Sequence, residues 1–203
     1  MGRVPSHLMR LRQLAMALSK LPPHPQRSVE LEQYPTEGDF AARWIAEMVH
    51  LGDITEETRV ADLGAGNGIL GIGCLLAGAK NVELVEIDSE CVHQMYAEQV
   101  SWSIMDIAKW DATDIDLIVM NPPWGVQSPL ADRPFLETAF SSSAQIIHCL
   151  HSAQAKHVAA LAKDHGWIPE RILSGEFKLP PVYLHHTSKQ ATTEVSAWRF
   201  CRE

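Results

Sequence analysis

The stretch Ile115-Asp116-Leu117-Ile118-Val119-Met120-Asn121-Pro122-Pro123-Trp124 decides how the chain is organised. Its apolar first half is typical of a buried strand in a parallel sheet. Because proline has a fixed φ and no N–H, two successive prolines end the strand. The chain therefore leaves the sheet at the carboxyl end of a strand, which is where ligands bind in open α/β sheets.

The four residues after this strand bring an amide, a rigid turn and a large aromatic ring to that edge. The side-chain oxygen of Asn121 and the carbonyl oxygen of Pro122 can accept the two hydrogens of one planar NH2 group. Trp124 can stack on the flat group that carries this nitrogen. We therefore interpret Asn121, Pro122, Pro123 and Trp124 as catalytic residues acting on an amide or exocyclic nitrogen. The alternative is a proline-rich loop with a tryptophan in the core.

A Gly-rich turn lies upstream, within the stretch RVADLGAGNGIL at residues 59–70. It follows a short apolar strand and precedes an apolar helix, and its glycines permit tight backbone angles and close approach of a ligand. Asp62 ends the strand, where a carboxylate can reach a ligand directly or through water. We expect this turn to contact a cofactor through Asp62, Gly64, Gly66 and Asn67.

The strand predicted at residues 81–88 ends in acidic residues. They lie about twenty residues after the turn, where a ribose-binding carboxylate belongs in a βαβ nucleotide site. Glu86 is the best placed for the ribose hydroxyls, and Asp88 is expected to cap a helix beginning near Ser89. A third strand, predicted at residues 100–105, ends at Asp106. This acid either binds the adenine amine of the cofactor or is a surface residue.

The spacing of the glycines bears on the identity of the cofactor. The turn reads Gly64-x-Gly66-x-Gly68 and follows an acid, whereas a dehydrogenase shows G-x-G-x-x-G. The pattern favours a nucleoside without a pyrophosphate, such as S-adenosylmethionine, over NAD.

The remaining elements predict a three-layer α/β fold in one domain, residues 1–203. Residues 1–58 are a helical extension, with helices predicted at 7–20 and 37–50 and Thr36 as N-cap of the second. Residues 59–203 form a Rossmann-like core. Later strands are predicted at residues 145–150, 167–173 and 195–201, the last two as an antiparallel pair.

Composition is that of an ordinary soluble globular protein, with 46% hydrophobic and 21% charged residues among 203. No apolar run approaches the length of a membrane span, and the first residues lack the apolar core of a signal peptide. The four cysteines are scattered, which indicates buried thiols in a reducing, cytoplasmic setting. None of the ten histidines falls in an H-E-x-x-H pattern, so no metal site is predicted.

The net charge of −8 argues against a generally basic nucleic-acid binder. Its distribution is uneven, however, because residues 1–29 carry five Lys or Arg and no acid. This segment is either an arm that faces phosphates or a solvated surface.

Taken together, the Gly-rich turn and the Asn-Pro-Pro-Trp motif resemble class I S-adenosylmethionine-dependent amino-methyltransferases. More narrowly, LEQYPT at residues 31–36 and NPPWG at 121–125 resemble the methyltransferase-like-five family and its archaeal relatives. Those enzymes make N6-methyladenine in small-subunit ribosomal RNA. The likeness continues through residues 135–139 and His151 to the end of the chain.

The resemblance implies a three-layer Rossmann-like class I methyltransferase with a seven-stranded, mostly parallel sheet and one reversed strand. It implies cofactor contacts at the following positions: Gln33, Thr36, Gly64, Glu86, Asp106 and Asn121. Family members in eukaryotes and archaea also bind a small zinc-containing activator protein by β-strand addition at a sheet edge. A third strand with an exposed Trp102 would suit such a partner.

We therefore expect an S-adenosylmethionine-dependent N6-adenine methyltransferase acting on RNA. A protein glutamine N5-methyltransferase is one alternative, although its motif usually ends in Tyr and it normally carries a separate N-terminal bundle. A DNA adenine methyltransferase is another, although it usually needs a target-recognition insert. A non-catalytic RNA- or protein-binding scaffold is the alternative of a different class.

Overall fold

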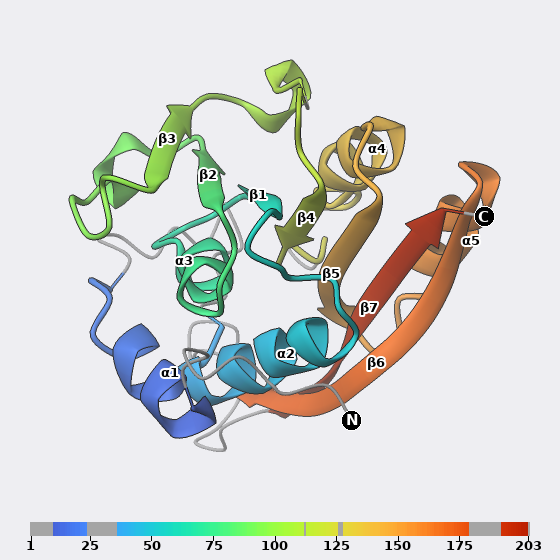
Figure 1. The fold of residues 1–203 in the computed structure, drawn as a ribbon. Helices are drawn as coiled ribbons and strands as arrows, with labels where there is room; N and C mark the ends of the chain where they lie inside the picture. The colour runs from blue at the N-terminus through green and yellow to red at the C-terminus, as the bar shows by residue number, and fades with distance from the viewer. Residues whose placement is uncertain (1–9, 24–35, 112, 126–127, 179–191, 203) are drawn as a thin grey trace.

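Seven strands form one sheet in the order β3-β2-β1-β4-β5-β7-β6. The structure is a computed structural model that describes residues 10–23, 36–111, 113–125, 128–178 and 192–202 (Figure 1). The strands are β1 (Arg59–Leu63), β2 (Asn81–Glu86), β3 (Val100–Ile104), β4 (Leu117–Met120), β5 (Ile146–Ser152), β6 (Trp167–Lys178) and β7 (Thr192–Arg202). The helices are α1 (Leu11–Leu18), α2 (Gly38–His50), α3 (Ile69–Leu76), α4 (Arg133–Ser141) and α5 (Lys156–Asp164), with short 3₁₀ turns η1 (Ser89–Cys91) and η2 (Ile107–Lys109).

Strand direction confirms the predicted sheet. β1 pairs in parallel with β2 and β4, β3 is parallel to β2, and β5 is parallel to β4. β7 runs antiparallel to both of its neighbours, β5 and β6. It is therefore the one reversed strand, and the predicted antiparallel pairing of the last two strands is correct.

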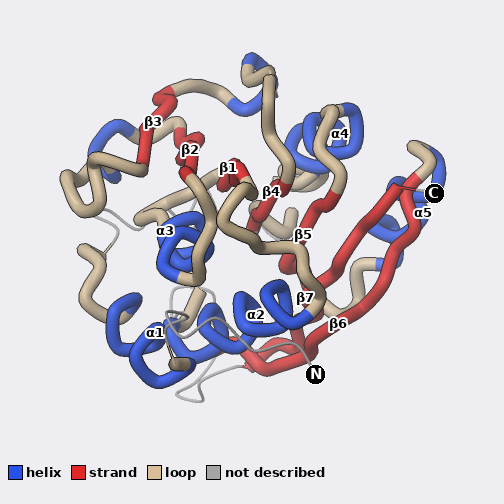
Figure 2. The backbone as a smooth tube through the Cα atoms, viewed as in Figure 1, coloured by secondary structure: helices blue, strands red, loops and turns tan. Residues whose placement is uncertain are grey.

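Burial along β4 shows why the fold has three layers. Its four residues are all buried and alternate between two hydrophobic clusters. Leu117 and Val119 join the cluster that includes residues of α1, α2 and α3, whereas Ile118 and Met120 join the cluster that includes residues of α4 and α5. Since side chains alternate across a strand, the helices cover both faces of the sheet (Figure 2).

The two N-terminal helices share the core of the face that α3 covers. Leu18 of α1, Trp44 of α2 and Ile72 of α3 belong to the same buried cluster. The start of α2 differs from the prediction, because its N-cap is Glu37 and this residue makes no side-chain capping bond. Thr36 is instead used in the site described below.

Two further elements differ from the predictions. The helix expected near Ser89 is only the 3₁₀ turn η1, although Asp88 does cap it by accepting a hydrogen bond from the Glu90 N–H. β6 extends to Lys178, five residues beyond the prediction, because β7 pairs with it along its whole length. The pairing itself was predicted, but its extent was not.

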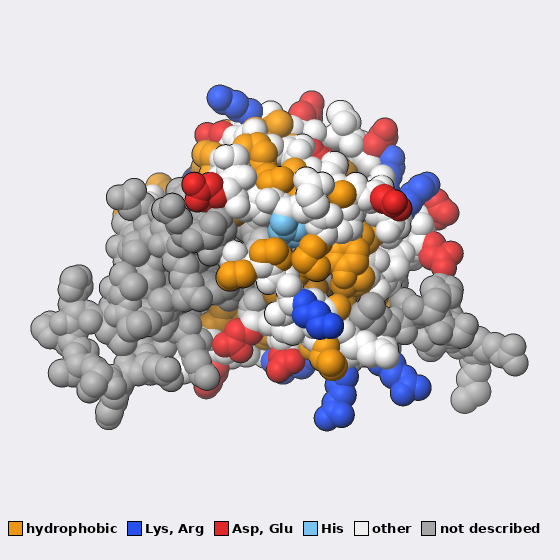
Figure 3. All heavy atoms as spheres, turned by 90° about the vertical axis from the view of Figure 1, so that its left-hand side faces the viewer, with side chains coloured by type: hydrophobic (Ala, Val, Ile, Leu, Met, Phe, Trp, Pro, Cys, Tyr) orange, Lys and Arg blue, Asp and Glu red, His pale blue; other side chains and the backbone are white. Residues whose placement is uncertain are grey.

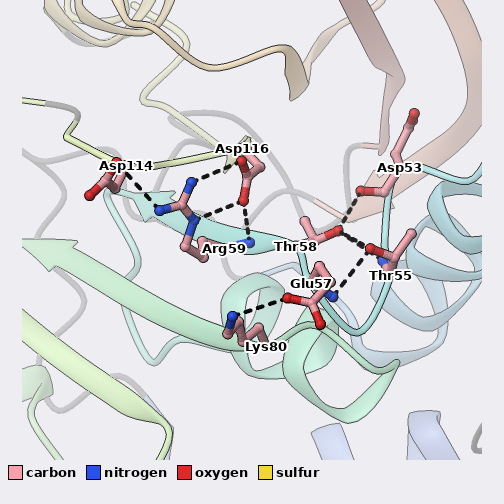
Figure 4. A network of polar contacts seen from close by, with 8 residues as sticks. All are labelled: Asp53, Thr55, Glu57, Thr58, Arg59, Lys80, Asp114 and Asp116. Atoms are coloured by element: carbon pink, nitrogen blue, oxygen red, sulfur yellow. Dashed lines mark hydrogen bonds and ion pairs between the residues drawn. The ribbon is translucent and has the colours of Figure 1, made fainter.

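A buried ion pair joins the α2–β1 connection to the sheet. The Asp53 carboxylate accepts hydrogen bonds from Arg199 Nε and Nη2, both at 2.8 Å, and lies 2.8 Å from His148 Nε2. Burial alone would raise the pKa of Asp53, but the hydrogen bonds from Arg199 and His148 outweigh it and lower the pKa to about 2. Arg59 and Asp116 form a second two-pronged pair that is partly exposed (Figure 4).

None of the described helices combines the length and the apolar character needed to cross a membrane. The four cysteines are free thiols, three of them buried. Burial raises the pKa of Cys91 to about 12 and raises the pKa values of Cys74 and Cys149 further still.

Gly71 in α3 is where the helix approaches β2 most tightly. A Cβ at this position would lie 2.5 Å from Leu84 Cδ2, 2.7 Å from Val82 Cγ1 and 3.0 Å from Asp62 Cβ. We expect Gly71→Ala to lower stability by about 1–3 kcal/mol, because overpacking outweighs the gain in helix propensity. Chemical denaturation would measure this change in the free energy of unfolding.

Gly38 provides the matched control for this substitution. It is also helical, but a Cβ there would meet nothing nearer than 3.5 Å. Gly38→Ala should therefore be neutral or slightly stabilising. An equal loss in the two variants would contradict the packing argument.

Candidate active site

Three strand ends meet at one edge of the sheet. In the strand register Leu63 of β1 lies opposite Val85 of β2 and Met120 of β4. Asn121 follows β4 directly, as Gly64 follows β1, and Glu86 is the last residue of β2. The Gly-rich turn, the acid and the Asn-Pro-Pro-Trp motif therefore begin side by side, as the sequence analysis expected.

The Gly-rich turn requires glycine for conformation and for space. Gly64, Gly66 and Gly68 have φ values of +70°, +54° and +76°, in the left-handed region that side chains disfavour. The N–H groups of Gly64 and Ala65 both donate to the Val85 carbonyl oxygen. A Cβ on Gly64 would lie 2.8 Å from Phe135 Cε1 of α4, a neighbour of the turn that the sequence analysis did not include in the site.

Glu86 holds the turn against the end of β2. One carboxylate oxygen accepts a hydrogen bond from the Gly66 N–H at 2.8 Å. The other accepts from the N–H groups of Ile87 and Asp88, at 2.9 and 3.1 Å. The side chain is thus fixed at the edge of the sheet where it was predicted to meet a ligand.

Asp62 is buried near the end of β1, just before the turn. The residue is 1% exposed, and its Oδ2 accepts a hydrogen bond from the Gly71 N–H at 2.8 Å. Burial raises the pKa of Asp62 to about 8, with a further contribution from the nearby charge of Glu86, despite the opposing bond from Gly71. In this geometry the carboxyl group anchors α3, and its expected contact with a ligand stays a prediction.

Asn67 connects the turn to other parts of the chain. Its side-chain Nδ2 donates to the Pro22 carbonyl oxygen at 3.0 Å, and its own carbonyl oxygen lies 3.1 Å from His93 Nε2. The N-terminal segment therefore reaches the Gly-rich turn. Gln33, the predicted cofactor contact in that segment, lies outside the described residues.

Asn121 is held by contacts on both sides of its amide. Its Nδ2 donates to Thr36 Oγ1 at 3.2 Å, and its Oδ1 accepts from Trp124 Nε1 at 3.3 Å. Thr36 is buried, so its hydroxyl is positioned by the start of α2. The structure thus brings together Thr36 and Asn121, which are 85 residues apart in the sequence.

Trp124 is 8% exposed and belongs to the core on the face of the sheet that α2 and α3 cover. Its ring centroid lies 6.2 Å from those of His151 and Phe177, at interplanar angles of 28° and 38°. This packing fits the alternative interpretation of the motif, in which Trp124 is a core residue. In the described geometry the indole orients Asn121 through Nε1, and stacking on a substrate stays a prediction.

Asp106 is an exposed N-cap. Its Oδ1 accepts a hydrogen bond from the Ala108 N–H at 3.0 Å at the start of η2, which fits the surface-acid alternative. Its role in adenine binding stays a prediction.

Two apolar residues that the sequence analysis overlooked, Ile87 and Met105, are exposed directly after β2 and β3. The exposed fraction of Ile87 is 55%. The signal that could have identified Ile87 is its position between the acids Glu86 and Asp88.

Comparisons with known proteins agree on the family of folds. Residues 36–148 match the family model described as the methyltransferase small domain. The rRNA N(6)-adenosine-methyltransferase METTL5 of Danio rerio is 28% identical over 204 residues, which cover 95% of this chain and 99% of that protein. The segment that matches the family model contains the described site from Thr36 to Trp124.

Two solved structures with a similar fold are also methyltransferases or candidate methyltransferases. The PH1948 protein of Pyrococcus horikoshii, described as a candidate RNA methyltransferase, is 34% identical with a TM-score of 0.85 and covers 96% of this chain and 98% of that one. Magnesium protoporphyrin IX methyltransferase of Synechocystis, solved with bound S-adenosylmethionine, has a TM-score of 0.58 over 80% of this chain and 78% of that one. At 16% identity this second likeness shows the fold alone.

Proposed function

Because the chain belongs to the methyltransferase small domain family, we propose that it is an S-adenosylmethionine-dependent N6-adenine methyltransferase whose substrate is RNA, namely small-subunit ribosomal RNA. The observation that carries this proposal is the position of Asn121. Its amide is held by Thr36 and Trp124 at the sheet edge where the Gly-rich turn begins.

The residues at this edge fit S-adenosylmethionine. The turn at residues 64–68 has three left-handed glycines, and Glu86 ends β2 with a carboxylate beside that turn. The exposed side chains of Ile87 and Met105 offer apolar surface for a flat base. When bound, S-adenosylmethionine supplies a methyl group on a positively charged sulfur, activated for transfer to a nucleophile.

Asn121 and Pro122 would hold the acceptor nitrogen. The adenine amine is a weak nucleophile because its lone pair is delocalised into the ring. The Asn121 side-chain oxygen and the Pro122 carbonyl oxygen are acceptors that can each take one of its hydrogens. This arrangement acts by positioning and electrostatics, without a covalent intermediate on the protein.

An adenine must leave its stack to reach this site, as in base-flipping enzymes. The contacts of Trp124 support a positioning role, because its Nε1 hydrogen bond fixes the Asn121 oxygen. A stacking role would require the indole to present a face to the base, and such stacking is worth about 1–3 kcal/mol per base.

The free edge of β3 is the surface that suits a protein partner. β3 is the terminal strand of the sheet, and Val92, Ile104 and Met105 near this edge are exposed apolar residues. Figure 3, which faces this side of the molecule, shows hydrophobic side chains gathered there. We propose that a small zinc-containing activator adds a strand to β3. Trp102 is half-buried, not exposed as expected, and contributes little to this surface.

The decisive experiment is incubation of the protein with labelled S-adenosylmethionine and total RNA, with and without a candidate activator. We expect the label in small-subunit ribosomal RNA, recovered as N6-methyladenosine after nuclease digestion. Label on a glutamine of a protein, or on DNA supplied in parallel, would establish one of the alternative substrates. Absence of cofactor binding in a titration, with and without the partner, would indicate a non-catalytic scaffold.

A further inference from the structure

Three side chains that the proposed reaction does not use meet behind the Asn-Pro-Pro-Trp motif. Asp132 precedes α4, His151 lies near the end of β5, and His157 lies in the first turn of α5. Asp132 Oδ2 is 3.0 Å from His151 Nε2 and 2.5 Å from His157 Nε2. Their possible ligand atoms all lie within 4.8 Å of one another.

The orientation of Asp132 is unusual for its place in the chain. It occupies the N-cap of α4, where an aspartate normally accepts a hydrogen bond from a backbone N–H of the first turn. Here it makes no side-chain capping bond. The buried carboxylate is turned instead toward two imidazoles, which are metal ligands as well as hydrogen-bond partners.

The donor set is that of a metal site. Zn²⁺ is bound by imidazole nitrogens and carboxylate oxygens at about 2.0–2.2 Å, so its ligand atoms lie about 3.3 Å from one another. The two measured separations from Asp132 Oδ2 require only small movements to reach that value. His151 and Asp132 are buried, and His157 is exposed on 55% of its side chain, so an ion can enter from solvent on that side.

We propose that Asp132, His151 and His157 bind a divalent transition-metal ion, Zn²⁺, through three protein ligands and with a remaining position open to solvent. The sequence analysis predicted no metal site, because the three residues share no short motif and are brought together only by the fold. This proposal does not depend on the proposed methyltransferase activity.

The site has a structural consequence for the neighbouring motif. The His151 ring lies against the Trp124 indole, and Asp132 ends the connection that runs from Trp124 to α4. An ion held by Asp132, His151 and His157 would tie that connection to β5 and α5. These three residues would therefore act on the motif indirectly, through the contact of His151 with Trp124.

The test begins with the full chain, from which a chelator has removed any bound metal. Zn²⁺ is then titrated into it in a calorimeter, and the absorption spectrum after addition of Co²⁺ is a second readout. We expect one Zn²⁺ bound per chain at this site and a tetrahedral-type Co²⁺ spectrum. His157→Ala should weaken binding at least about tenfold and abolish the Co²⁺ band. Because His157 is half-exposed, this variant should keep its fold, which circular dichroism would verify.

Two further variants make the result specific. His50→Ala removes an exposed histidine at the end of α2, outside the cluster, and should bind Zn²⁺ as the original chain does. Asp132→Asn keeps the shape of the side chain but removes the charge, and should weaken binding as His157→Ala does. Binding of unchanged affinity and stoichiometry in His157→Ala and Asp132→Asn, or no Zn²⁺ binding by the original chain, would overturn the proposal.

Discussion

Replacing Asn121 with alanine should reduce methyl transfer at least about 100-fold, the loss seen when a single group that stabilises or orients the reacting atoms is removed. The variant loses the oxygen that would accept a hydrogen from the substrate amine. It also loses the bonds that Asn121 makes with Thr36 and Trp124, so the two sides of the site are no longer tied together. Transfer of label from S-adenosylmethionine to RNA measures the loss.

Binding of the cofactor separates this effect from general damage. The Gly-rich turn and Glu86 are tied to each other without Asn121, so Asn121→Ala should weaken cofactor affinity only modestly. Asn81→Ala is the matched control and should keep full activity. Asn81 is exposed at the start of β2, at the end of the strand opposite to Glu86. Undiminished turnover in Asn121→Ala would remove this residue from the catalytic assignment.

The sheet edge that carries the site was predictable because it depends on local patterns. The apolar run before Asn121, the prolines after it and the glycines at residues 64–68 each have one structural meaning. The parallel order of the strands then brings Glu86 beside the turn. The outer boundaries were less accurate: β6 is longer than predicted because it pairs with β7 along its whole length, beyond the residues on which the prediction rested.

The contacts that individual side chains make could not be predicted from the sequence. Asp62 ends β1 as predicted, and its carboxylate accepts a hydrogen bond from the Gly71 N–H, a partner that the sequence did not indicate. Trp124 follows the prolines as predicted, but its indole packs on His151 and Phe177. Asp132 has the position of a helix cap and bonds to histidines instead. The partners of Trp124 and Asp132 come from elements that only the fold brings near.

Replacing Arg199 with methionine should lower the free energy of unfolding by about 3–5 kcal/mol, because it leaves the Asp53 carboxylate buried without its main partner. Arg199 donates two hydrogen bonds of 2.8 Å to that carboxylate, whereas His148 approaches it through one ring nitrogen. Burial lowers the pKa of His148, despite the opposing bond from Asp53, so this histidine is a weak source of positive charge. Denaturant unfolding would measure the change.

Arg59 provides the control, because it makes the same two-pronged bond to Asp116 in a partly exposed position. Arg59→Met should cost no more than about 1 kcal/mol, as expected of a solvated ion pair. The double variant Asp53→Asn with Arg199→Met should be more stable than Arg199→Met alone, since the uncompensated charge is gone. If the double variant is no more stable than the single one, the loss comes from packing around Arg199 and the electrostatic account of this contact is wrong.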